Sequence, residues 1–219
     1  MIKNSIILLM LLFLVYCSKE AKTISERSNK DSLVITETDS LNSLNPNVET
    51  ESNSKEETLK TLNSEILSAL KSNEIEKLSK FIHPEKGIRF SMYGYVQPNT
   101  DKYFTKEEFI KYAPTNIKFT WGEKDGTGDQ LVLSIKDYLN QWVFKRDFTS
   151  AEYYQNSFKG GGNSINNLKE IYPKTDFTEN YIPGSEKYGG IDWNSLRFVF
   201  EELYGTYYLV AVINDEWTV

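Results

Sequence analysis

The chain contains very little of the two residues that most often form disulfides or bind zinc. Its 219 residues include one cysteine, Cys17, and one histidine, His83. A single thiol cannot form a disulfide within the chain, so packing alone must hold an exported domain together. Zinc sites made of histidine and cysteine need more such ligands than the chain has. We therefore expect no metal site and no cofactor, and only cation binding by carboxylates stays open.

Basic residues are fewer than acidic ones. The sequence has 25 Lys and Arg against 31 Asp and Glu, which gives a formal net charge of −6 at pH 7. Nucleic-acid-binding proteins usually carry a basic surface that neutralises phosphates. The composition therefore argues against a nucleic-acid partner, but it does not choose among proteins, small ligands and membranes.

Long hydrophobic runs are absent except at the N-terminus, where Lys3 precedes an unbroken apolar stretch over residues 6–15. Spanning a bilayer takes about 20 apolar residues, so this stretch is too short for an ordinary membrane span. A positive start followed by a short apolar stretch is typical of a secretory signal peptide. We predict that residues 1–16 are such a signal.

The segment Leu14-Val15-Tyr16-Cys17 resembles the bacterial lipobox. The resemblance implies lipid attachment to the Cys17 thiol, cleavage before it, and acylation of the new amino terminus with chains such as palmitate. Several acyl chains hold a protein stably on a membrane, whereas one gives marginal binding. Tyr16 departs from the small residue usual before the cysteine, so a secreted protein and a signal-anchored protein remain alternatives. We predict a lipoprotein held on an extracytoplasmic face of the cell envelope.

Residues 17–54 are predicted to be the lipidated cysteine and a flexible polar tether. From Ser18 to Ser54 the chain has no aromatic residue and is rich in Ser, Thr, Asn, Glu and Lys. Such a segment cannot bury enough apolar area to offset its chain entropy. On flexible-linker scaling its reach is roughly 35 Å.

Residues 55–219 carry nearly all the aromatic residues and suit one globular domain. Ser54 and Glu57 have capping-box spacing before a helical apolar pattern, and Asn73 is the expected N-cap of a second helix that Pro84 ends. Later, capping residues and alternating apolar residues predict helices from Thr105 and Ser134 and several strands. The strands are expected over 88–93, 117–121, 131–133, 177–182, 196–203 and 206–219. Helices first and antiparallel strands last predict an α+β domain with helices on one face of a curved sheet.

This order of elements resembles the nuclear-transport-factor-like, or cystatin-like, α+β cone, in which a bent sheet and helices enclose a pocket. Several segments also resemble an uncharacterised group of bacterial exported lipoproteins. They are HPEKG with IRFS at 83–91, WGEKDGTG at 121–128, GGN with NN at 161–167, PGSEKYGGIDWNSLRFVFE at 183–201 and DEWT at 215–218. The resemblance implies an extracytoplasmic module without an assigned reaction, since cone folds include small-ligand binders, some enzymes and many non-catalytic modules.

Charged side chains supply the first candidates for a pocket. His83 could act as a general base if Glu85 or Glu179 faced it, although its place at a helix end favours capping of free carbonyls. Arg89 and Arg197 each lie between apolar neighbours in expected strands. Either could point into the cone and pair with Glu179, Glu201 or an anionic ligand, or face solvent.

Aromatic side chains supply the others. Tyr93, Tyr95, Tyr181, Trp193 and Trp217 could stack on a ligand or carbohydrate, but most aromatic residues belong to a core. The candidate pocket therefore combines charged and aromatic residues from several segments. Its members are His83, Arg89, Tyr93, Glu179, Trp193 and Arg197.

Two glycine-rich loops have weaker claims. Asp125-Gly126-Thr127-Gly128 resembles an aspartic-protease triplet or a calcium loop, but the partner carboxylates are missing and a hairpin turn is favoured. Residues 160–163 lack the Lys-Ser/Thr pair of a nucleotide loop, so a lid or a plain turn is favoured. Neither loop, by its sequence, indicates catalysis.

Three classes of function therefore stay open. The leading one is a non-catalytic, lipid-anchored envelope module that binds a small ligand or another envelope protein. The alternatives are a cone-fold enzyme that transfers protons through a pocket histidine or carboxylate, and a purely structural interaction lipoprotein. A pocket that brings His83, Arg89 and a carboxylate together favours catalysis; a pocket without these contacts favours binding; a filled cone favours interaction alone.

Overall fold

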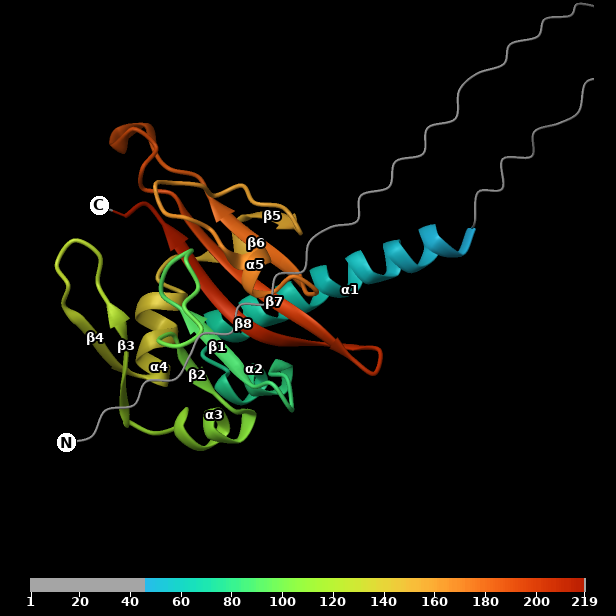
Figure 1. The fold of residues 1–219 in the computed structure, drawn as a ribbon, viewed down its shortest axis with the longest axis horizontal. Coiled ribbons are helices and arrows are strands. Elements are labelled where there is room, and N and C mark those ends of the chain that lie inside the picture. Colours follow the sequence, from blue (N-terminus) through green and yellow to red (C-terminus); the bar gives the residue numbers. More distant parts are fainter. Residues whose placement is uncertain (1–45, 219) are drawn as a thin grey trace, which may run out of the picture. The chain divides into compact units, whose positions relative to one another are not determined.

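The computed structural model describes residues 46–218, with side chains from Ser54 onward (Figure 1). These described residues belong to one compact unit. The expected signal peptide, Cys17 and most of the expected tether lie outside the described residues. The helices are α1 (Pro46–Lys71), α2 (Ile75–Phe81), α3 (Lys106–Tyr112), α4 (Ile135–Tyr138) and α5 (Leu168–Ile171). The strands are β1 (Ile88–Ser91), β2 (Lys102–Phe104), β3 (Lys118–Glu123), β4 (Gln130–Ser134), β5 (Glu152–Gln155), β6 (Asp176–Ile182), β7 (Asn194–Leu203) and β8 (Thr206–Glu216).

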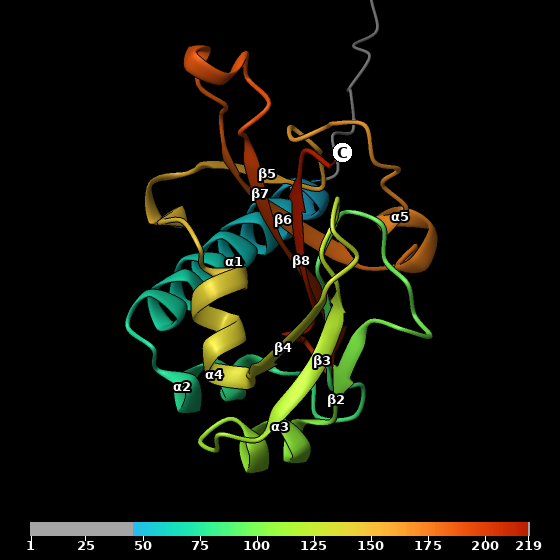
Figure 2. The same cartoon turned by 90° about the vertical axis from the view of Figure 1, so that its left-hand side faces the viewer.

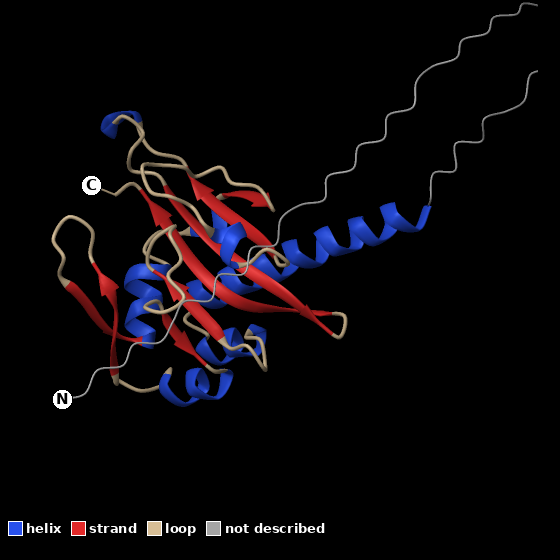
Figure 3. Cartoon of the chain, viewed as in Figure 1, coloured by secondary structure: helices blue, strands red, loops and turns tan. Residues whose placement is uncertain are grey.

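The main sheet has six strands in the order β2-β1-β8-β7-β6-β5. All its pairs are antiparallel except β1 with β8, which is parallel. The sheet is curved and open, with β2 and β5 at its edges, and β3 and β4 form a separate hairpin beside it (Figure 3). The expected α+β class with a mostly antiparallel sheet is confirmed, although the strands are not one continuous meander.

Helices α1, α2 and α4 lie on one side of the sheet, and α5 lies on the other (Figure 2). The first side holds the larger core, where Leu59, Ile66 and Leu70 of α1 are buried as the helical spacing predicts. Leu196 and Phe198 of β7 face the same core. These side chains fill the space between helices and sheet, because the hydrophobic effect favours removing them from water.

The second side of the sheet has a smaller core. Val199, Ala211 and Ile213 of β7 and β8 pack there with Val96 and Leu168. Strand β7 is thus buried on both faces, which explains why almost every one of its residues from Asn194 to Phe200 is inaccessible. The covering chain on this side is the long connection between β5 and β6.

Buried amides anchor α1 to the sheet. The Asn63 side chain donates to Asn180 Oδ1 at 2.9 Å and accepts from the Thr178 hydroxyl at 2.7 Å. Asn180 in turn donates to the Leu196 carbonyl at 3.1 Å. Since buried polar groups without partners are costly, these bonds fix the register of the helix on β6.

Two predictions of local structure need correction, and a third is found in extended form. Helix α1 begins at Pro46, eight positions before Ser54, so it includes the end of the expected tether. Asn73 is no N-cap: it has a left-handed φ of 56° in the turn before α2, and Glu74 is the residue that precedes the helix. The expected helix after Ser134 is α4, which continues as a π-helical turn over Leu139–Val143. The capping box of Thr105 and Glu108 is confirmed.

In residues 46–218, no helix is both long and apolar enough to cross a membrane. Helix α1 has the length, but its sequence is mostly polar.

The most deeply buried charge is Arg197, on the α5 side of β7. Its guanidinium donates through Nε and Nη2 to Glu179 Oε1, at 3.0 and 2.8 Å, and through Nη1 to Asp215 Oδ2 at 2.8 Å. Nη2 also donates to the Gly160 carbonyl at 3.1 Å. The side chains of Arg197 and Glu179 are fully inaccessible and that of Asp215 is 3% exposed. We call Glu179, Arg197 and Asp215 the buried ion cluster.

The buried ion cluster also fastens the loop that covers it. Glu179 accepts the backbone amides of Lys159 and Gly160, and Phe158 lies over the Arg197 guanidinium, 5.0 Å from it. A Cβ at Gly160 would stand 2.2 Å from the Ser195 hydroxyl, so only glycine allows this approach. Residues 158–160 are therefore an anchored cover, and the lid or plain turn expected over 160–163 stays a prediction.

Replacing Arg197 with Met should destabilise the protein strongly. The variant would keep the volume of the side chain but leave two carboxylates buried without their cation, which costs about 3–5 kcal/mol. Urea denaturation followed by circular dichroism measures the loss. Lys71→Met is the control, because the Lys71–Asp147 pair is about half exposed and should contribute little. Equal stability of Arg197→Met and the wild type would contradict the role of the cluster.

Candidate functional site

A cleft of about 480 Å³ lies between the end of β1, the turn before β2 and the β3–β4 hairpin. Its walls combine aromatic rings, carboxylates, amides and hydroxyls. The lining residues are Ser91, Met92, Tyr93, Tyr95, Gln97, Thr100, Asp101, Thr120, Trp121, Gly122, Glu123, Gln130 and Thr218. We call it the aromatic cleft.

The aromatic wall is held from behind by helix α4 and its π-helical continuation. Trp121 stacks flat on Tyr138 of α4, with 3.6 Å between ring centroids, and its Nε1 donates to the Leu133 carbonyl at 3.0 Å. Trp142 of the π-helical turn meets Tyr93 edge-on at 5.8 Å and donates to the Met92 carbonyl at 3.2 Å. π-Helical turns are frequent at functional sites, and this one supports the wall of the cleft.

One carboxylate of the cleft is unusual. Burial raises the pKa of Asp101 above its ordinary value of 3.8, against the opposing effects of hydrogen bonds from Gln97 and Ser91 and of the Arg89 charge. The backbone amide of Gln97 donates to Asp101 Oδ2 at 2.8 Å. A partly desolvated carboxylate with a raised pKa inside a cleft is a feature of binding and catalytic sites.

Tyr93 connects the two sides of the cleft. Its hydroxyl accepts a hydrogen bond from the Asp125 amide in the hairpin turn at 2.7 Å. Burial raises its pKa. The turn over 125–128 uses the left-handed conformations of Gly126 and Gly128, which confirms the expected hairpin turn at this segment. The contact with Tyr93 fixes how far the hairpin stands from β1.

The segment after β1 is fixed by three contacts. The Ser91 hydroxyl donates to the Tyr93 carbonyl at 2.8 Å, and the Val96 backbone exchanges two hydrogen bonds with the Asn167 amide at 2.8 and 2.9 Å. Gly94 packs directly on Asp215, where a Cβ would come within 2.7 Å of the carboxylate. Because Asp215 is held by Arg197, the buried ion cluster positions this wall of the cleft.

The electrostatic character of the lining is acidic. Asp101 and Glu123 are its ionisable carboxylates, and none of the lining residues is Lys, Arg or His. Stacking surfaces with carboxylate, amide and hydroxyl groups suit a polar ligand that is neutral or cationic. An anionic ligand would be repelled.

His83 lies elsewhere, in the turn between α2 and β1, and is 1% exposed. Its Nδ1 accepts from the amides of Glu85 and Lys86 at 3.1 and 2.9 Å, and burial lowers its pKa. The imidazole was expected to donate to free carbonyls at the helix end, but its Nδ1 accepts hydrogen bonds from amides that follow it. The Ile82 carbonyl accepts from Lys106 instead. The neutral imidazole thus stabilises a turn, away from the aromatic cleft.

The structure separates the remaining predicted pocket residues. Glu179 and Arg197 pair, which was one of the two alternatives for Arg197, and they do so inside the second core. Trp193 is 5% exposed and packs against Gly160 and Gly162. Arg89 lines a different cleft, and Tyr93 is the one member of the predicted set in the lining of the aromatic cleft.

Sequence reasoning missed Asp101 and Trp121. Trp121 belongs to the segment WGEKDGTG, which is used above for the resemblance to exported lipoproteins but not for a candidate site. Asp101 sits in a polar turn, and its partial desolvation arises only in the folded chain. No local pattern marks such a residue.

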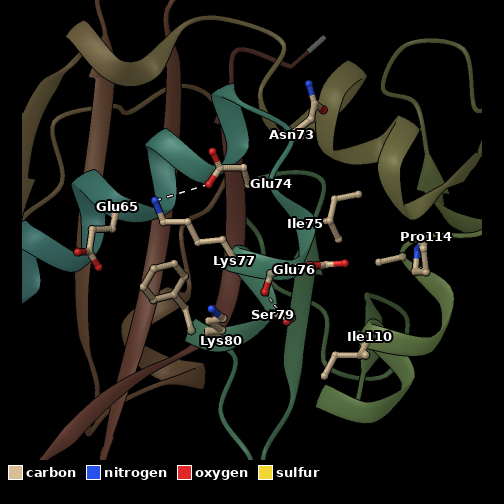
Figure 4. Close-up of a pocket in the computed structure, with 12 residues that line it drawn as sticks. Glu65, Asn73, Glu74, Ile75, Glu76, Lys77, Ser79, Lys80, Ile110 and Pro114 are labelled. Atoms are coloured by element: carbon tan, nitrogen blue, oxygen red, sulfur yellow. Dashed lines mark hydrogen bonds and ion pairs between the residues drawn. The ribbon is translucent and has the colours of Figure 1, made fainter.

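A second hollow, of about 880 Å³, lies between helices α1, α2 and α3 (Figure 4). Its apolar side chains include Ile75, Ile110 and Pro114. Some of its polar groups pair along α2: Lys77 with Glu74 at 3.6 Å, and the Ser79 hydroxyl with the Glu76 carbonyl. These polar groups do not converge on the hollow, so the aromatic cleft is the stronger candidate.

Within residues 54–218, no three His, Cys, Asp or Glu side chains gather in a way that would hold a metal ion. A comparison of the chain with models of known families and with curated proteins finds no match.

Replacing Asp101 with Asn should raise the melting temperature near pH 7. A carboxyl whose pKa is raised on folding binds its proton more tightly in the folded state, so stability falls as pH rises from 3.8 to the folded pKa. Asn cannot ionise and avoids this loss, while its oxygen still accepts from Gln97. Thermal melts near pH 3 and near pH 7 test it: the gain should disappear at the lower pH. A gain of the same size at both would contradict the desolvated carboxylate.

Proposed function

We propose that the protein is a non-catalytic binding module whose aromatic cleft takes a small polar ligand of the carbohydrate type. The observation that carries the proposal is the partly desolvated Asp101 carboxylate in the same lining as the rings of Tyr93 and Tyr95, a lining that the buried Trp121 supports from behind. Desolvating this carboxylate costs stability, and a hydrogen bond from a ligand hydroxyl would offset the cost.

The lining supports a polyhydroxylated ligand. Rings of Tyr and Trp stack on the apolar faces of sugars, while carboxylates and amides accept and donate to hydroxyls. Gln97, Thr100 and Gln130 add such groups around Asp101. The volume of about 480 Å³ is within the range of small-molecule sites.

His83 and Arg89 are not part of this lining, which supports binding rather than the general-base arrangement considered from the sequence. One observation favours a second candidate function. A carboxyl with a raised pKa can act as a general acid or base, so proton-transfer catalysis by Asp101 is the alternative. Turnover of a bound sugar that Asp101→Asn abolishes, with affinity retained, would favour the enzyme.

Titration of neutral oligosaccharides, such as trimers of N-acetylglucosamine and of glucose, tests the binding function. Tryptophan fluorescence is the readout, because Trp121 and Trp142 lie at the cleft. Tyr95→Ala and Asp101→Asn should each weaken binding about tenfold, corresponding to the loss of one stacking ring or one charged hydrogen bond.

Tyr188→Ala is the matched control. Tyr188 is 53% exposed and Tyr95 is 48% exposed, but Tyr188 lies outside the cleft. Its variant should bind as the wild type does. Equal weakening by both tyrosine variants would contradict the assignment, and so would saturation by a cationic amine with no response to any sugar.

We further propose that the module is a lipoprotein anchored at Cys17 on an extracytoplasmic face of the cell envelope, as a member of an exported lipoprotein group with a cone-like domain. Support comes from the signal-like residues 1–16, the lipobox-like segment and the curved sheet with α1, α2 and α4 on one side. In this arrangement the ligand would be a component of the envelope or of the medium.

Replacing Cys17 with Ala should move the protein out of the membrane fraction, because the acyl chains supply most of its membrane affinity. Fractionation and immunoblotting give the distribution, and intact-mass spectrometry of the wild type gives the added lipid mass. A Ser18→Ala variant serves as the control and should stay with the membrane. Unchanged retention of Cys17→Ala would rule out the lipid anchor.

A further inference from the structure

A separate cleft of about 390 Å³ lies on the α5 side of the sheet, around Arg89 of β1. Its walls come from the turn before β1, from β2, from the end of α5 and from β7 and β8. The lining residues are Lys86, Arg89, Tyr103, Ile171, Tyr172, Pro173, Lys174, Thr175, Glu201 and Val210. We call it the Arg89 cleft.

The Arg89 cleft is basic, in contrast to the acidic chain and to the aromatic cleft. Lys86, Arg89 and Lys174 are its cations, and Glu201 is its carboxylate. Lys86 forms an ion pair with Glu201, which leaves the charges of Arg89 and Lys174 uncompensated within the lining. In residues 54–218, no carboxylate lies in ion-pair contact with Arg89.

The Arg89 guanidinium is nevertheless held in place. Nη1 donates to the Pro98 carbonyl at 2.7 Å and to the Asp101 carbonyl at 3.4 Å. The guanidinium lies over the Tyr103 ring at 5.8 Å, and it interacts with the Tyr172 hydroxyl. A guanidinium fixed through one nitrogen keeps further N–H donors for a planar or tetrahedral oxyanion.

We propose that the Arg89 cleft binds the phosphate group of a small molecule. Phosphate monoesters carry about −1.5 to −2 charge at pH 7, which matches the two uncompensated cations. Arg89 donates the directional hydrogen bonds, and Lys174, which is exposed at the rim, adds a mobile charge. The hydroxyls of Tyr103 and Tyr172 supply neutral donors, and Glu201 stays with Lys86. The lining of this site shares no residue with that of the aromatic cleft.

Titration of the full-length protein, held in neutral phosphatidylcholine nanodiscs, with inorganic phosphate and with glycerol 3-phosphate tests the proposal. Calorimetry gives the affinity. Arg89→Gln should weaken binding about tenfold or more, since it removes charge-assisted hydrogen bonds, and Arg89→Lys should restore only part of it. Lys174→Gln should weaken binding severalfold without affecting folding, because this side chain is exposed.

Lys187→Gln is the control, since Lys187 is an equally exposed lysine outside the cleft. Equal affinity of Lys174→Gln, Lys187→Gln and wild-type protein, or the absence of any saturable heat, would overturn the proposal. Nanodiscs that also contain phosphatidic acid separate the two sources of phosphate. If the wild type loses its response to added phosphate in these discs, and Arg89→Gln still responds as it does in neutral discs, the lipid headgroup occupies the cleft. If the wild-type response is the same in both kinds of disc, the cleft binds a soluble phosphate.

Discussion

The interaction on which the rest of the structure depends is the pairing of Arg197 with Glu179 and Asp215. These three side chains come from neighbouring strands β7, β6 and β8, and all are buried. Burying charges carries a large desolvation free energy, which is offset only when every partner is in place. Because Glu179 also accepts the Lys159 and Gly160 amides, the pairing cannot be complete without the covering loop. The sheet and its cover therefore form together.

The same cluster reaches the aromatic cleft through Asp215. The Asp215 carboxylate packs against Gly94, which lies between Tyr93 and Tyr95 in the sequence. Burial raises the pKa of Asp215 despite the nearby Arg197 charge. On the other side of the loop, Asn163 accepts from the amide and the hydroxyl of Thr218, a lining residue of the cleft. The geometry of the proposed binding site is thus set from inside the second core, away from the ligand.

The sequence predicted those parts of the fold that follow from local periodicity. The buried face of α1 and the strands β6, β7 and β8 come from apolar spacing that a single segment carries. Strands β2 and β5 were missed because they are edge strands of three and four residues, too short to show alternation. The parallel pairing of β1 with β8 joins distant segments, and no local pattern specifies it.

The site was harder to predict than the fold. Arg197 alternates with Leu196 and Phe198 in β7, and this alternation is equally compatible with a solvent-facing position and with a covered ion pair. The covering loop, which is remote in sequence, decides it. The partial desolvation of Asp101 likewise arises only in the folded chain. Residues whose properties come from distant covering segments are those that one-dimensional patterns cannot identify.

Hydrogen–deuterium exchange of the Lys159 and Gly160 amides, followed by NMR, tests most directly whether the buried ion cluster fixes the loop over the sheet. Both amides donate to Glu179, so they should exchange only when the whole protein unfolds. Their exchange rates should therefore equal those of the central amides of β7. The Gly128 amide in the exposed hairpin turn provides the reference for local opening. Exchange of Lys159 and Gly160 at the rate of Gly128 would contradict the account.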